Sequence, residues 1–183
     1  MYLGRSKRRT RKTLPNFSNV QAFDCMPQNA TFPMKMLNSQ ILAENNTCYL
    51  KASFEVLEKL PTNLEVELTY IRCNPDQSGC QPYGKLIVSK LCEKMKVKTS
   101  VASRIVRGIS PEFICPIKPG TYEISKDLKF LQTMLLLSRT SVEGYSWGGR
   151  CEFYEKKDRK RIRTIFCVRT EGARLGSSLG KFK

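Results

Sequence analysis

The stretch FICPIKPGTYEISKDLKF, residues 113–130, combines a cysteine, a turn signal and a strand pattern in one segment. Pro119-Gly120 favours a tight turn, because proline pre-sets the first central position and glycine tolerates the backbone angles of the next. The apolar residues that follow are spaced as in a β-strand: Tyr122, Ile124, Leu128 and Phe130. The segment therefore indicates a loop that Cys115 anchors onto a sheet, although an ordinary loop-to-strand junction is the alternative interpretation.

The chain has 183 residues, with eight cysteines and no histidine, and its length is typical of one domain. Without histidine, a Ser-His-Asp triad, a Cys-His pair and a mixed Cys/His zinc site are excluded. A Cys₄ zinc site is not expected either, because only Cys73 and Cys80 are closely spaced. We therefore expect about four disulfides in an oxidising compartment, with no metal, no cofactor and no enzymatic activity.

Three glycosylation signals, at Asn16, Asn29 and Asn45, agree with an extracellular, secreted glycoprotein. The sequence contains no apolar run of about 18 residues that would span a membrane. Residues 1–30 also lack the apolar core of a signal peptide. Secretion is therefore expected from the cysteines and the glycosylation signals, although no signal peptide is visible in this chain.

The formal net charge of +16 is concentrated near the two ends of the chain. Residues 1–12 contain six basic residues and no acid, and residues 150–183 contain eleven Lys or Arg against four acids. We expect a basic, disordered arm over residues 1–15, a folded domain over 16–170 and a flexible tail over 171–183. A nucleic-acid-binding protein driven by these basic ends is the alternative hypothesis, although nucleic acid is not the expected partner.

Strand patterns recur along the chain, and the clearest is LEVELTYIRC, residues 64–73, where apolar and polar residues alternate. The other strands are expected at residues 17–25, 32–42, 47–57, 144–154 and 161–169. One helix is expected over residues 83–95, and residues 96–112 are expected to form an exposed loop. The pattern predicts an all-β fold, an immunoglobulin-like β-sandwich or cup of two antiparallel sheets with one short helix.

The chain resembles the ganglioside-activator-like branch of the ML (lipid-recognition) family, which includes secreted chemosensory proteins of insects. The resemblance lies in the order of the cysteines along the chain, the short helix and the Cys115–Tyr122 run. The resemblance covers roughly residues 17–170 and implies a β-cup whose sheets splay apart to hold a lipid. It also implies the disulfides Cys25–Cys167, Cys73–Cys80 and Cys92–Cys115, which leaves Cys48 to pair with Cys151.

A protein of this kind needs apolar side chains lining its interior. The candidates for ligand binding are Phe54, Val56, Leu68, Tyr70, Phe130, Leu135, Leu136, Tyr145, Trp147, Phe153, Ile162 and Phe166. Tyr145 and Trp147 are the candidates for the mouth or a membrane interface, and ordinary core packing is the alternative for the others. The expected partners are a lipid or hydrophobic small molecule, a receptor and a membrane surface, which the basic turn 156–161 would contact.

Overall fold

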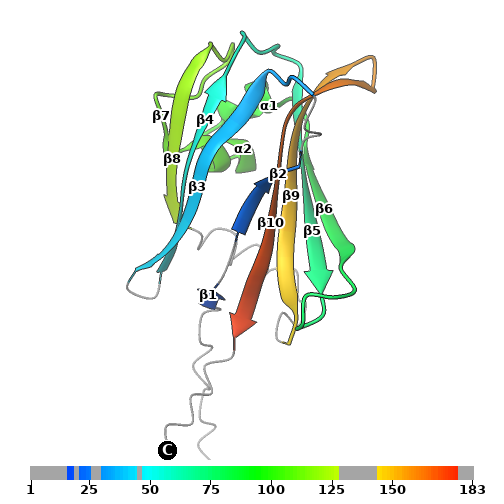
Figure 1. The fold of residues 1–183 in the computed structure, drawn as a ribbon. Coiled ribbons are helices and arrows are strands. Elements are labelled where there is room, and N and C mark those ends of the chain that lie inside the picture. The colour runs from blue at the N-terminus through cyan, green and yellow to red at the C-terminus, as the bar shows by residue number, and fades with distance from the viewer. Residues whose placement is uncertain (1–15, 19–20, 26–29, 45–46, 128–143, 177–183) are drawn as a thin grey trace, which may run out of the picture.

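The computed structural model describes residues 16–18, 21–25, 30–44, 47–127 and 144–176. They form a sandwich of two antiparallel sheets (Figure 1), as the alternating sequence patterns predict. Within these segments, none of the helices has the length and apolar character needed to cross a membrane.

The larger sheet has six strands in the order β1-β10-β9-β5-β6, with β2 also paired to β10. Its strands are β1 (Asn16–Ser18), β2 (Gln21–Asp24), β5 (Leu64–Cys73), β6 (Gln81–Val88), β9 (Ser146–Lys157) and β10 (Lys160–Gly176). The smaller sheet has the order β3-β4-β8-β7, built from β3 (Met34–Glu44), β4 (Thr47–Val56), β7 (Ile109–Ser110) and β8 (Gly120–Asp127). Two short helices, α1 (Leu91–Met95) and α2 (Val101–Val106), lie between β6 and β7 in the chain.

The helix predicted over residues 83–95 is wrong for its first half, which forms the edge strand β6. Leu86 and Val88 lie two residues apart and pair with Leu68 and Val66 of β5, so strand pairing overrides the helical spacing. Ile87, which a helix would have placed on the apolar face, is 47% exposed.

Two other expectations need correction. The exposed loop predicted over residues 96–112 contains α2, whose first turn is capped by Ser100, since its Oγ accepts the Ser103 N–H at 3.0 Å. Strand β10 runs to Gly176, into the segment predicted as a flexible tail, because β1 pairs with its last residues.

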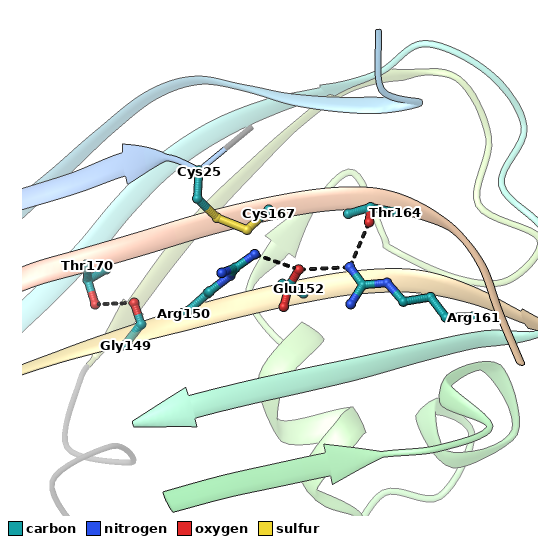
Figure 2. Close-up of a disulfide and its surroundings, with 8 residues drawn as sticks. All are labelled: Cys25, Gly149, Arg150, Glu152, Arg161, Thr164, Cys167 and Thr170. Atoms are coloured by element: carbon teal, nitrogen blue, oxygen red, sulfur yellow. Dashed lines mark hydrogen bonds and ion pairs between the residues drawn. A yellow bond between two sulfur atoms is a disulfide. The ribbon is translucent and has the colours of Figure 1, made fainter. Parts of the chain in front are cut away.

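Three of the predicted disulfides are present: Cys25–Cys167, Cys73–Cys80 and Cys92–Cys115. The first joins the end of β2 to β10 (Figure 2), and the third ties α1 to the loop before β8. Cys115 thus anchors its loop to helix α1, and not to a sheet as the sequence predicts. Several disulfides indicate an oxidising, extracellular-type environment.

The fourth predicted bridge, Cys48–Cys151, is wrong, because Cys151 is a free thiol. Cys48 belongs to β4 of the smaller sheet and Cys151 to β9 of the larger one. Strand patterns do not reveal to which sheet a strand belongs, so the elimination that paired these two cysteines could not place them on opposite sheets. The side chain of Cys48 itself lies outside the described residues.

The hydrophobic core is built around Phe54 of β4. Its ring centroid lies 5.6 Å from that of Tyr122, 5.8 Å from that of Phe113 and 6.4 Å from that of Phe166. Phe113 and Tyr122 belong to the stretch 113–130, and Phe166 belongs to the opposite sheet. The cluster therefore joins both sheets and the loop between β7 and β8.

An ionic network covers part of the outer face of the larger sheet. Glu65 is buried there; it accepts a 2.5 Å hydrogen bond from the Tyr154 hydroxyl, and both of its oxygens lie 3.0 Å from Lys156 Nζ. Burial alone would raise the pKa of Glu65, but hydrogen bonds from Ser89, Tyr154 and Lys156 and the charge of Lys156 lower it overall.

Glu152 forms the second part of this network, between Arg150 and Arg161 (Figure 2). Its Oε1 lies 3.0 Å from the Arg150 guanidinium and 2.8 Å from that of Arg161. These contacts outweigh burial and lower the pKa of Glu152. Arg161 also donates to Thr164 Oγ1 at 2.7 Å, which fixes the guanidinium beside the hairpin turn.

The network predicts how stability depends on pH. The pKa of Glu65 is lower in the folded protein than its usual value of 4.5, so its stabilising contribution is complete above about pH 4.5 and is lost as the pH falls through the folded pKa. Glu65→Gln should lower the free energy of unfolding by about 1–3 kcal/mol at neutral pH and flatten its decline in acid. Urea unfolding between about pH 3 and 7 measures both effects; Glu93→Gln, in an exposed pair on α1, is the control. An unchanged acid decline would contradict the prediction.

Gly148 allows the close approach of β9 to an irregular part of β10. The register of the two strands shifts between Thr170 and Ala173, and a Cβ on Gly148 would lie 2.4 Å from the Thr170 carbonyl oxygen. We therefore predict that Gly148→Ala destabilises the fold by about 1–3 kcal/mol, the usual cost of overpacking.

Gly84→Ala is the matched control, because its Cβ would make an ordinary 3.6 Å contact with the ring of Tyr70. Denaturant unfolding with the disulfides intact compares the two variants. Equal stabilities would show that β10 adjusts to a side chain at Gly148.

Candidate ligand site between the sheets

Alternation along β5 places one continuous row of residues on the inner face of the larger sheet. Leu64 and Val66 belong to the buried core, and Leu68 packs against it. Because β5 pairs with β9 without a register shift, the row continues through Tyr70 to Arg72, opposite Gly149 and Trp147. The inner face therefore extends beyond the core, toward the end of β5.

Burial along this row decreases toward the end where β5 finishes and β9 begins, which we call the open end. Leu64 and Val66 are 1% and 0% exposed, whereas Leu68 and Tyr70 are only partly buried. In Figure 1 the two sheets lie close together near the helices and diverge toward the open end. The apolar row thus continues where the opposite sheet lies farther away.

The smaller sheet shows the same gradient on its own inner face. Val56 and Phe54 of β4 are 1% and 7% exposed, and the next inward positions, Ala52 and Leu50, are partly buried. Ile41 of β3 pairs with Leu50, and Ile124 of β8 pairs with Ala52. Both sheets therefore present apolar side chains with remaining exposed area toward the open end.

Two polar side chains lie on these inner faces. Lys126 pairs with Leu50 on the smaller sheet, and its Nζ donates a 3.0 Å hydrogen bond to the carbonyl of Ile105. Burial, together with the charge of Arg107, lowers its pKa. On the larger sheet, burial raises the pKa of Tyr70. Both side chains are partly buried, which is the main cause of the two pKa shifts.

An aromatic cluster surrounds Arg72 at the open end. The Arg72 guanidinium carbon lies 4.8 Å from the ring centroid of Tyr83 and 4.7 Å from that of Tyr145. Trp147 meets the Tyr83 ring edge-on at 5.2 Å and is 3% exposed. Trp147 therefore packs inside the protein and does not present its ring to a membrane, which was one of the roles predicted for it.

The structure separates the predicted ligand residues into groups. Four belong to the closed core: Phe54, Val56, Phe153 and Phe166. Leu68 and Tyr70 lie on the partly buried inner face, and Tyr145 and Trp147 belong to the Arg72 cluster. Ile162 is wrong as a lining residue: it is 54% exposed, because register shifts between Thr164 and Phe166 and between Arg161 and Arg163 break the alternation assumed for β10.

Several predicted positions lie outside the described residues: Phe130, Leu135, Leu136, Asn29, Asn45 and the side chain of Asn16. Of the basic turn 156–161, Lys156 and Arg161 pair with acids of the sheet, whereas Lys157, Arg159 and Lys160 are exposed.

Sequence reasoning missed Arg72, Tyr83 and Lys126. Arg72 lies two residues after Tyr70 in the strand predicted over residues 64–73. Since every second residue of a strand lies on the same face, the sequence could have placed Arg72 on the inner face. Tyr83 was assigned to a helix that does not form there, and the pairing of Lys126 with Leu50 depends on a strand register that no local pattern reveals.

A separate pocket of about 110 Å³ lies beside the Cys73–Cys80 disulfide, where Arg169 and Glu171 form an ion pair. Ligand sites usually have volumes of about 300–1,000 Å³. This pocket is too small for a lipid, so the candidate site is the apolar interior toward the open end.

The free thiol gives a direct test of the disulfide assignment. Burial and the neighbouring Glu152 raise the pKa of Cys151 to about 12, so we predict that alkylation of native protein at pH 8 hardly modifies it, because the thiolate reacts. Alkylation after unfolding without reduction should label Cys151 and leave the three bridges intact, as peptide mass mapping would show. A Cys48–Cys151 linked peptide would contradict the structure.

The sequence matches no model of a known protein family and no curated protein. The resemblance to the lipid-recognition family therefore depends on the residues that carry it.

Proposed function

We propose that this protein is a non-enzymatic binding protein that holds a lipid or other hydrophobic ligand between its two sheets. The observation that carries the proposal is the loss of burial along the apolar rows of both sheets. On β5, Val66 is 0% exposed, whereas Leu68, nearer the open end, is only partly buried. On β4, Val56 is 1% exposed, whereas Leu50, nearer the open end, is only partly buried. A bound apolar chain would cover the exposed area that these side chains retain, which contributes about 25 cal/mol per Å².

The compartment and the resemblance support a more specific version of this proposal. Three disulfides suit an extracellular carrier, and the lipid-recognition family binds lipids without catalysis. We therefore extend the proposal to a secreted, glycosylated carrier that delivers a signal molecule of the pheromone type to a receptor. Contact with a membrane surface through the exposed Lys157, Arg159 and Lys160 belongs to the same proposal.

The alternative, a nucleic-acid-binding protein, receives less support from the described residues. On the outer face of the larger sheet, Lys85, Lys156 and Arg161 are each paired with a carboxylate, of Glu67, Glu65 and Glu152 respectively. Neutralised pairs attract phosphates weakly, whereas nucleic-acid sites present clustered basic side chains.

The proposal predicts that the wild-type protein binds the apolar fluorescent probe N-phenyl-1-naphthylamine and that Leu68→Asp weakens this binding at least about tenfold, because a carboxylate on the inner face costs more than 1.4 kcal/mol to desolvate. Ile87→Asp is the matched control, since Ile87 lies on the neighbouring strand and is 47% exposed. Fluorescence titration measures binding, and thermal unfolding verifies that both variants fold.

Equal binding by the two variants would place the probe outside the sandwich. Absence of probe binding to the wild-type protein, combined with oligonucleotide binding that falls steeply with salt, would favour the nucleic-acid alternative.

A further inference from the structure

Arg72 occupies a special position at the boundary of the apolar interior. It follows Leu68 and Tyr70 in the inner row of β5, and its Cα partner is Trp147 of β9. A ligand chain lying along this row would therefore end beside the Arg72 guanidinium. The end of the ligand, and not its apolar chain, would thus contact the charge of Arg72.

Two tyrosine rings lie within cation–π distance of the Arg72 guanidinium. Its central carbon is 4.8 Å from the ring centroid of Tyr83 and 4.7 Å from that of Tyr145, and the Trp147 ring packs edge-on against Tyr83. Such contacts stabilise the charged group in place, but they supply no oxygen that accepts hydrogen bonds from its five N–H donors.

No carboxylate pairs with Arg72 among the described residues, and no hydrogen bond engages its N–H groups there. Other arginines of the same sheet differ: Arg150 and Arg161 contact Glu152, and Arg163 contacts Glu155. An arginine that is held in place but has no acidic partner is prepared to accept an external anion.

We propose that the ligand is an anionic amphiphile, whose apolar chain lies along the inner faces and whose carboxylate pairs with Arg72. The inference rests on the proposed function, which it deepens by naming the chemical class of the ligand. A carboxylate fits because its two oxygens match the guanidinium fork. Arg72 is then the residue that distinguishes acids from alcohols of equal chain length.

The test compares dodecanoate with dodecanol, each displacing N-phenyl-1-naphthylamine at pH 8, where dodecanoate is ionised. The wild-type protein should bind dodecanoate more tightly. Arg72→Met should weaken dodecanoate binding by about ten- to a hundredfold, the usual effect of losing a charge-assisted hydrogen bond. It should change the affinities for dodecanol and the probe by less than about twofold, and Arg72→Lys should give an intermediate loss.

Arg150→Met is the matched control, because Arg150 lies on the outer side of the same sheet and Arg161 still neutralises Glu152. Equal losses of dodecanoate and dodecanol binding in Arg72→Met would overturn the inference and make Arg72 a support for the two tyrosines. Equal wild-type affinities for the two compounds would also overturn it while leaving the proposed function intact. If the wild-type protein binds neither compound nor the probe, the proposed function itself fails.

Discussion

The packing of Phe54 against aromatic rings from three parts of the chain is the interaction on which the rest of the structure depends. Tyr122 comes from the neighbouring strand, Phe113 from the loop tied down by Cys115, and Phe166 from the opposite sheet. Two sheets must bury their apolar faces against each other to be stable. This cluster achieves that burial near the helices, where Ile117 and Ile165 are both 0% exposed.

The closed core explains why an apolar interior can extend beyond it. Because Phe54, Phe113, Tyr122 and Phe166 join the sheets near the helices, the strands can diverge toward the open end without losing the fold (Figure 1). Disulfides reinforce this arrangement: Cys25–Cys167 fixes β2 to β10, and Cys92–Cys115 fixes α1 to the loop. Toward the open end the inner side chains of both sheets, such as Leu68 and Leu50, are only partly buried.

The two faces of the larger sheet use charge differently. On the outer face, Glu65 and Glu152 are each neutralised by basic neighbours, so burial of these carboxylates does not destabilise the fold. On the inner face, the partly buried Arg72 lies beside the rings of Tyr83 and Tyr145 and has no acidic partner among the described residues. A guanidinium without an acidic partner can pair with a carboxylate from outside the protein, which is the physical reason for proposing an anionic ligand.

Much of the fold could be predicted from the sequence, because strand alternation and turn chemistry are local properties. Residues 64–73 alternate so regularly that β5 has the predicted bounds, and Gly120 has the positive φ of 149° that its turn position suggested. Tertiary structure decided what depends on partners: β6 formed beside β5 in place of a helix, and Cys151, on the sheet opposite that of Cys48, remained a free thiol. The cluster around Arg72 likewise required tertiary structure, because residues 72, 83, 145 and 147 meet only after β5, β6 and β9 have paired.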